Sequence, residues 1–115
     1  MTTLAARKII TGYGGRGFKI NADFVEGSLL IWEEQCWRWD GAVTEVSLAP
    51  LLENENIELL LIGTGKVAQP ISDSIKNLLR SRAIAFDVMD TGAACRTFNV
   101  LAGEGRRVAA AIVAV

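Results

Sequence analysis

The sequence predicts a layered α/β domain in which a parallel core is extended by an N-terminal antiparallel β segment. The chain has 115 residues, which is enough for one domain and too few for two of ordinary size. Half of its residues are hydrophobic, so it can build a core without disulfides or a structural metal ion. Short glycine-punctuated runs fill the first half, whereas longer strand and helix patterns alternate from Ile57 onward. We therefore expect residues 1–115 to form a single domain.

The N-terminal β segment consists of the runs KIITGY, GFKI and SLLIWEEQCWRWDGAV. Trp37 and Trp39 stand two residues apart, so they share one face of a strand. The letters EEQ predict a turn between Trp32 and Cys36. The run SLAPLLENEN predicts a helical turn or loop before the second half begins.

The second half predicts a βαβαβ unit. In PISDSIKNLLRSR, apolar residues recur at helical spacing, and Pro70 suits the first helical position because its missing N–H would have no partner there. The runs AIAFDVM and VAAAIVAV are apolar on both faces, which is typical of parallel strands covered from both sides. The expected elements are strand 57–62, helix 70–82, strand 84–89, helix 91–103 and strand 108–114.

Charge and composition exclude several classes of protein. Residues 1–58 carry 5 basic and 9 acidic side chains, whereas residues 59–115 carry 7 basic and 4 acidic ones. Even the second half is too weakly basic to predict a nucleic-acid partner. No apolar run approaches the roughly 20 residues of a membrane span, and nothing resembles a secretion signal. The two cysteines, Cys36 and Cys95, fit a reducing compartment. A cytoplasmic location is therefore expected.

The sequence contains no histidine. Ser-His-Asp and Cys-His catalysis are excluded within these residues, and a transition-metal site would have to rely on two cysteines and carboxylates. We therefore expect no catalytic constellation, no metal and no cofactor.

The stretch LLLIGTGKVAQPI resembles the start of a dinucleotide-binding unit. Gly63, Gly65 and Ala68 fit the loose G-x-G-x-x-G/A spacing. However, too few βα units follow for a dinucleotide fold, and Pro70 makes the loop longer than a tight dinucleotide turn. The five-residue spacing to Gly-Lys in a Walker loop is also missing. The alternative is that the glycines let the chain turn at a strand end.

A second turn lies at the start of MDTGAACRTFNV. If strands 57–62 and 84–89 are parallel neighbours, the turns at 63–65 and 90–92 open at the same edge of the sheet, and two helix N-termini meet at one crevice. Their free N–H groups favour a small anion, to which Lys66 would add attraction and Asp90 repulsion. The alternative for Asp90 or Thr91 is an ordinary helix cap.

Four further polar residues complete this hypothetical site. Cys95 lies near the helix start, where the dipole can lower a thiol pKa, although a buried structural thiol is the alternative. Thr97 and Asn99 either face the crevice or bond solvent and backbone. Arg106 either binds an anion or partner or serves solubility. The hypothetical ligand-binding residues are Gly63, Thr64, Gly65, Lys66, Asp90, Thr91, Cys95, Thr97, Asn99 and Arg106.

The chain resembles a small domain of unknown function, the Mth-type domain. The specific letters are IGTG combined with DT, AC and TFN followed by EGR, and GFKIN and GSLLIW extend the resemblance over nearly the whole chain. This family includes mitochondrial respiratory complex I assembly factor three and the adipogenesis-associated Mth-type domain protein. The resemblance implies a three-layer α/β fold with a mixed central sheet. It implies no reaction, and the chain lacks the targeting extension of the mitochondrial member, so we expect a prokaryotic protein.

Two function classes fit these observations. The first is a non-enzymatic binding or assembly module that contacts a protein partner or a second copy through an exposed patch. Trp32, Trp37 and Trp39 are candidates for that patch, with core packing as the alternative. The second is a small-anion or metabolite-binding protein, which could be an enzyme, with its site at the paired helix N-termini after strands 57–62 and 84–89.

Overall fold

The structure is a computed structural model that describes residues 8–54 and 56–115. Its helices are α1 (Ala49–Leu52), α2 (Asp73–Ser81) and α3 (Thr91–Gly103). Its strands are β1 (Ile10–Gly14), β2 (Gly17–Ile20), β3 (Asp23–Glu26), β4 (Ser28–Trp32), β5 (Gln35–Trp39), β6 (Leu59–Gly63), β7 (Ala85–Met89) and β8 (Val108–Ile112).

The central sheet has five strands in the order β5-β4-β8-β6-β7. Strand β6 pairs in parallel with β7 and β8, whereas β4 pairs antiparallel with β5 and β8. Every residue of β8 is buried, as expected for a strand that is apolar on both faces. The predicted mixed sheet and the parallel pairing of the two strands before the glycine turns are thus confirmed.

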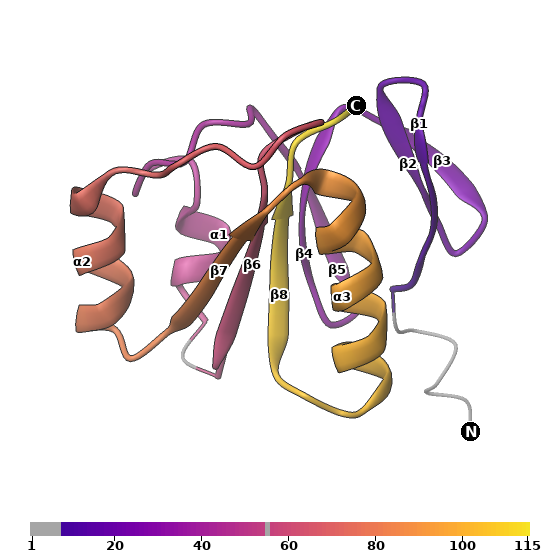
Figure 1. The fold of residues 1–115 in the computed structure, drawn as a ribbon. Coiled ribbons are helices and arrows are strands. Elements are labelled where there is room, and N and C mark those ends of the chain that lie inside the picture. The colour runs from indigo at the N-terminus through magenta and orange to yellow at the C-terminus, as the bar shows by residue number, and fades with distance from the viewer. Residues whose placement is uncertain (1–7, 55) are drawn as a thin grey trace.

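Two separate hydrophobic clusters cover the faces of this sheet and give the fold its three layers (Figure 1). On one face, Leu51 of α1 and Leu79 of α2 pack on the sheet. On the other face, Phe98 of α3 and Phe18 of the small sheet pack on it. The three-layer α/β class expected from the resemblance is confirmed. Within the described part of the chain, no helix is both long and apolar enough to cross a membrane.

The N-terminal β segment divides between two sheets. Strands β4 and β5 extend the central sheet, with a turn between Trp32 and Gln35, whereas β1, β2 and β3 form an antiparallel sheet of their own. Strand β3 is missing from the sequence prediction because DFVE is short and carries a charge at each end. An added Cβ on Gly17 of β2 would overlap the Val25 carbonyl oxygen of β3 and would lie 2.7 Å from the Phe24 ring. The close approach of the β3 backbone explains why a glycine occupies this strand position.

Helix α2 begins later than predicted. Its N-cap is Ser72, whose hydroxyl accepts a hydrogen bond from the Ile75 N–H at 3.2 Å. Pro70 therefore lies in the loop, and the prediction that it is the first helical residue is wrong. A serine cap satisfies an otherwise unpaired N–H, which a proline does not do. The loop from β6 to α2 consequently spans residues 64–72.

Candidate functional site

The turn after β6 is joined to the start of α3 by hydrogen bonds in both directions. The Thr91 N–H donates to the Gly65 carbonyl at 2.8 Å, and the Thr91 hydroxyl accepts from the Gly65 N–H at 2.9 Å. The same hydroxyl donates to the Val113 carbonyl at 2.7 Å. Thr91 is completely buried. Its side chain thus links β6, α3 and the end of β8, and we call this contact the Thr91 junction.

Glycine at position 63 allows α3 to approach the sheet at this junction. A Cβ on Gly63 would lie 2.9 Å from the Thr91 Cα and 3.0 Å from the Ala94 Cβ. Gly65 has φ +107°, a conformation that residues with a side chain rarely adopt. The close approach of α3 and the positive φ therefore explain the two glycines of the dinucleotide-like motif without a bound nucleotide.

The N–H groups expected to bind an anion are largely used within the fold. Asp90 is the N-cap of α3, and its carboxylate accepts from the Ala93 N–H at 3.0 Å. The Thr64 N–H donates to the Met89 carbonyl at 3.0 Å. Lys66 is exposed in the loop that follows. The alternative interpretation of Asp90 as a helix cap is therefore confirmed.

The predicted pair of helix N-termini is separated by the sheet. Helix α2 starts at Asp73 and its buried residues pack with α1, whereas α3 packs on the opposite face with the small sheet. The turns at 63–65 and 90–92 do meet at one edge, as predicted. The Thr91 junction occupies the place where the sequence predicts a crevice between the two helices.

Cys95 is buried at the inner side of α3, with 2% of its surface exposed. Burial raises the pKa of its thiol to about 12, an effect that Arg96 opposes and Asp90 reinforces. The lowered pKa suggested by the helix dipole is therefore wrong. At neutral pH this cysteine is a neutral thiol within the core, in agreement with the alternative of a structural residue.

Asn99 fastens the small sheet to α3. Its amide donates to the Ile10 carbonyl at 2.7 Å and its oxygen accepts from the Ile10 N–H at 2.9 Å. Near the start of the helix, Arg96 donates to the Tyr13 hydroxyl at 2.9 Å. Thr97 is half-buried on the same helix. Asn99 thus bonds the backbone, one of the two roles that the sequence left open.

Arg106 lies away from the junction, at the opposite edge of the sheet. It precedes β8 and forms an ion pair with Glu58, which precedes β6, with 3.1 Å between Nε and Oε1. The bonds from Arg106 and from the Arg107 N–H lower the pKa of Glu58. The structure therefore separates Arg106 from the other predicted site residues.

Two of the three tryptophans are core residues. Trp32 and Trp39 are buried, and Trp37 packs against the same cluster while half-buried. The suggestion that they form an exposed patch is wrong for Trp32 and Trp39, because both pack into the layer between the sheet and helices α1 and α2. Among the described residues, no three cysteines or carboxylates gather as a metal site.

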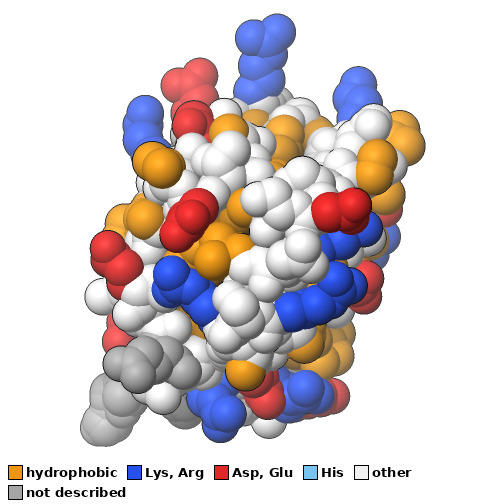
Figure 2. All heavy atoms as spheres, turned by 90° about the vertical axis from the view of Figure 1, so that its left-hand side faces the viewer, with side chains coloured by type: hydrophobic (Ala, Val, Ile, Leu, Met, Phe, Trp, Pro, Cys, Tyr) orange, Lys and Arg blue, Asp and Glu red, His pale blue; other side chains and the backbone are white. Residues whose placement is uncertain are grey.

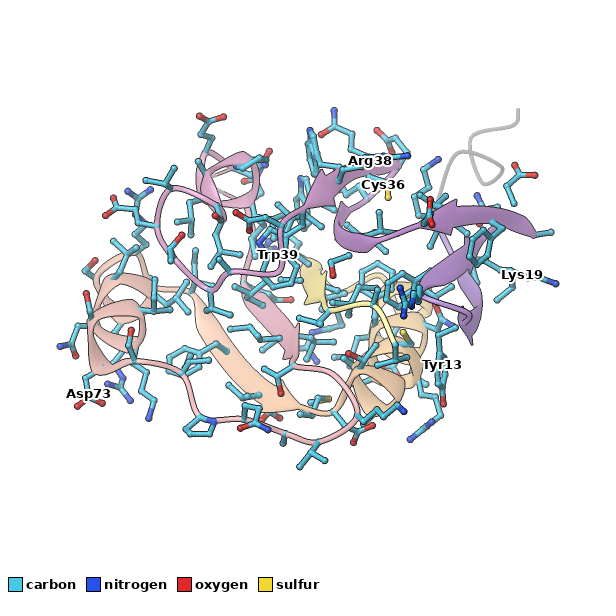
Figure 3. The ribbon with its side chains drawn as sticks, turned by 90° about the horizontal axis from the view of Figure 1, so that it is seen from above. Tyr13, Lys19, Cys36, Arg38, Trp39 and Asp73 are labelled. Carbon is cyan, nitrogen blue, oxygen red and sulfur yellow. The ribbon has the colours of Figure 1, made fainter. Side chains whose placement is uncertain are left out.

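The structure reveals a hollow that the sequence analysis missed, on the α1 and α2 side of the junction. It measures about 420 Å³ and lies between the segment after Trp39 and the loop that leads to Asp73. Figure 3 labels Trp39 and Asp73 and so helps to locate both segments. We call it the edge hollow. Its lining residues are Gly41, Val43, Thr64, Gln69, Pro70, Ile71, Ser72 and Val113. Val43 comes from a loop that has no periodic pattern, so no sequence signal could assign it to this site.

Residues 10–113 match the model of a family described as protein of unknown function (DUF498/DUF598). The chain belongs to this family. The match spans β1 to the residue after β8, so the junction and the edge hollow both lie within it. The family membership inferred from IGTG, DT and TFN is thereby confirmed.

Curated relatives of this chain include the NADH dehydrogenase [ubiquinone] 1 alpha subcomplex assembly factor 3 of zebrafish and of human, each 36% identical to this chain. The alignments cover 95% and 90% of this chain but only 66% and 59% of those proteins. An uncharacterized protein of Rhodobacter capsulatus is 34% identical, with 90% of this chain and 82% of that protein covered.

Solved structures give the same fold. A protein of Bartonella henselae, described as an outer membrane protein, is 37% identical with a TM-score of 0.90, covering 95% of this chain and 96% of that one. A Bordetella pertussis structure described as a Mth938-like domain is 24% identical with a TM-score of 0.80, covering 98% and 89%. The latter likeness shows the Mth938-like fold alone.

Proposed function

We propose that this protein is a non-enzymatic binding or assembly module that acts through protein contacts. The observation that carries this proposal is the alignment of proteins named as assembly factors with at least 90% of this chain. The chain spans 66% or less of the length of those relatives. We therefore take from their names only the class of activity, namely contact with other proteins.

The chemistry of the predicted site residues supports this choice. Thr91 and Asn99 use their polar atoms to join elements of the fold. Cys95 keeps its proton at neutral pH because burial raises its pKa to about 12. These groups therefore contribute to a rigid body rather than to a reactive centre. A cytoplasmic location is part of the same proposal.

Chemical cross-linking of the tagged chain in cells, followed by mass spectrometry, tests the proposal. We expect one or a few proteins to be cross-linked to defined residues of this chain, or a second copy to be linked at the same residues. Sedimentation of the purified chain then distinguishes a partner from self-association. If the chain forms no cross-links in cells and does not self-associate at micromolar concentration, the proposal is contradicted.

A small anion or metabolite at the Thr91 junction is the second candidate, supported by the exposed Lys66 directly after Gly65. A thermal-shift screen with phosphate, nucleotides and carboxylates tests it. The candidate requires one of these anions to raise the melting temperature of the wild-type chain and to leave that of Lys66→Ala unmoved. If no anion shifts the wild-type chain, the candidate fails.

A further inference from the structure

We propose that the edge hollow binds uncharged apolar side chains of a protein partner. This inference rests on the proposed function and gives that function a location. The hollow lies at the carboxyl edge of parallel strands, beside the turn that follows β6. Ligands of open α/β sheets bind preferentially at this edge. Its volume of about 420 Å³ leaves room for more than one side chain.

The charge and polarity of the lining define the chemistry of the occupant. Among the described residues that line the hollow, none carries a charge. Its apolar walls are Val43, Pro70, Ile71 and Val113, and its polar residues are neutral hydroxyl and amide groups. A carboxylate or phosphate that a partner buried here would lose hydration without gaining a cation from the lining. An uncharged apolar group is therefore the complementary occupant.

The open shape of the hollow favours a protein over a small metabolite. Pockets for small molecules enclose roughly 70–90% of their ligand. The edge hollow is a broad depression open to solvent, so a small molecule would keep much of its surface exposed. Val67, two residues before Gln69 in the same loop, is 64% exposed, and we take it as the rim. A partner protein can cover the hollow and this rim together, as interfaces with a central apolar anchor do.

Hydrogen bonds hold the wall of the hollow in place before any partner binds. The Thr64 hydroxyl donates to the Val67 carbonyl at 3.0 Å and accepts from the Gln69 N–H at 2.7 Å. Ser72 is fixed as the cap of α2. These bonds order the loop that carries Pro70, so binding loses little backbone freedom there.

The face that α2 presents has no single sign of charge. Figure 2, which views the left side of Figure 1, shows hydrophobic side chains set among both acidic and basic ones. A partner that docks at the edge hollow therefore gains little from long-range attraction. Its binding should depend weakly on salt and strongly on the apolar anchor.

Selection of a random peptide library displayed on phage against the wild-type chain tests the inference. We expect enriched peptides to share an uncharged apolar core. Their affinity should fall about ten-fold or more with Gln69→Glu or Pro70→Asp, because each places a carboxylate at the hollow. Asn77→Asp is the matched control, since it makes the same amide-to-carboxylate change on the exposed face of α2 and should leave binding unchanged.

The absence of enriched peptides would overturn the inference. Enrichment of peptides that bind Gln69→Glu and Pro70→Asp as tightly as the wild-type chain would overturn it as well. Binding of neutral small molecules alone, seen by chemical-shift changes at Val43 and Ile71, would assign the hollow to a metabolite and also overturn it. If cross-linking in cells finds a partner that both variants retain, the assignment of the edge hollow as the binding site is wrong while the proposed function stands.

Discussion

The Thr91 hydroxyl accepts a hydrogen bond from the Gly65 N–H at 2.9 Å, while the Thr91 N–H donates to the Gly65 carbonyl at 2.8 Å. This reciprocal contact joins residues 26 positions apart, at the place where the sequence suggested an anion site. The two turns that the sequence predicts as ligand loops are therefore hydrogen-bonded to each other. Substitutions at this contact should first change the stability of the fold.

Thr91→Val should destabilise the fold. The substitution keeps the volume but leaves the Gly65 N–H and the Val113 carbonyl without their partner in a buried place, which costs about 1–3 kcal/mol. Urea unfolding measures the loss. Thr97→Val, on the same helix but half-buried, should change the free energy of unfolding by less than about 0.5 kcal/mol. Equal losses in the two variants would show that the junction contributes nothing specific.

Gly63→Ala should also destabilise the protein, by about 1–3 kcal/mol, because its new Cβ meets the backbone of α3 at 2.9 Å and the helix must shift. Gly103→Ala is the matched control. Gly103 lies in α3 with open space around the position of an added Cβ, so alanine there should stabilise by about 0.5–1 kcal/mol. Opposite signs in thermal unfolding are expected, and a neutral Gly63→Ala would contradict the close approach.

Asn99→Ala should loosen the small sheet from α3. It removes both hydrogen bonds to the backbone of Ile10, so the Ile10 amide should exchange with solvent faster than in the wild-type chain, while amides of β8 keep their protection. Hydrogen exchange followed by NMR resolves the two regions. Unchanged exchange at Ile10 would mean that packing alone holds β1 in place.

Cys95 should react slowly with thiol reagents and should make stability depend on alkaline pH. Its folded pKa of about 12 lies above the ordinary value of 9.0. The contribution of the buried neutral thiol to the free energy of unfolding is therefore fully present below pH 9 and is lost as pH rises toward 12. The wild-type chain should lose at most about 1.4 kcal/mol per pH unit more than Cys95→Ala in this window. Urea midpoints at pH 8 and pH 10 give the difference.

Cys36 provides an internal comparison for the alkylation. It is half-buried, and the pKa-raising effect of its burial is opposed by Lys8. Iodoacetamide at pH 8 should therefore modify Cys36 before Cys95, as read by mass spectrometry of the peptides. Faster modification of Cys95 would contradict its burial.

Much of the fold could be predicted from the sequence because local signals and burial agree there. VAAAI is apolar on both faces and forms the fully buried β8, and Asp90 caps α3. The start of α2 was misplaced because Pro70 and Ser72 both carry N-terminal signals, and the hydrogen bond of Ser72 decides between them. Strand β3 has no apolar pattern, since its Phe24 is exposed rather than packed in the core.

The candidate site was harder to predict than the fold. The sequence correctly places Gly63, Thr64, Gly65, Asp90 and Thr91 at one edge, since parallel strands end together. It could not show that Thr91 points at Gly65 and Val113, because these two partners follow different strands, β6 and β8. The edge hollow was missed for the same reason, as Val43 and Ile71 meet only in the folded chain.

Site-specific photo-cross-linking at position 67 tests the central claim most directly. A benzoylphenylalanine in place of the exposed Val67 should form an adduct with a partner protein in cells, and Pro70→Asp in the same chain should abolish that adduct. The same residue in place of Val100, which is 59% exposed on α3, should give no such adduct. Adducts from position 100 alone, or an adduct at position 67 that survives Pro70→Asp, would contradict protein binding at the edge hollow.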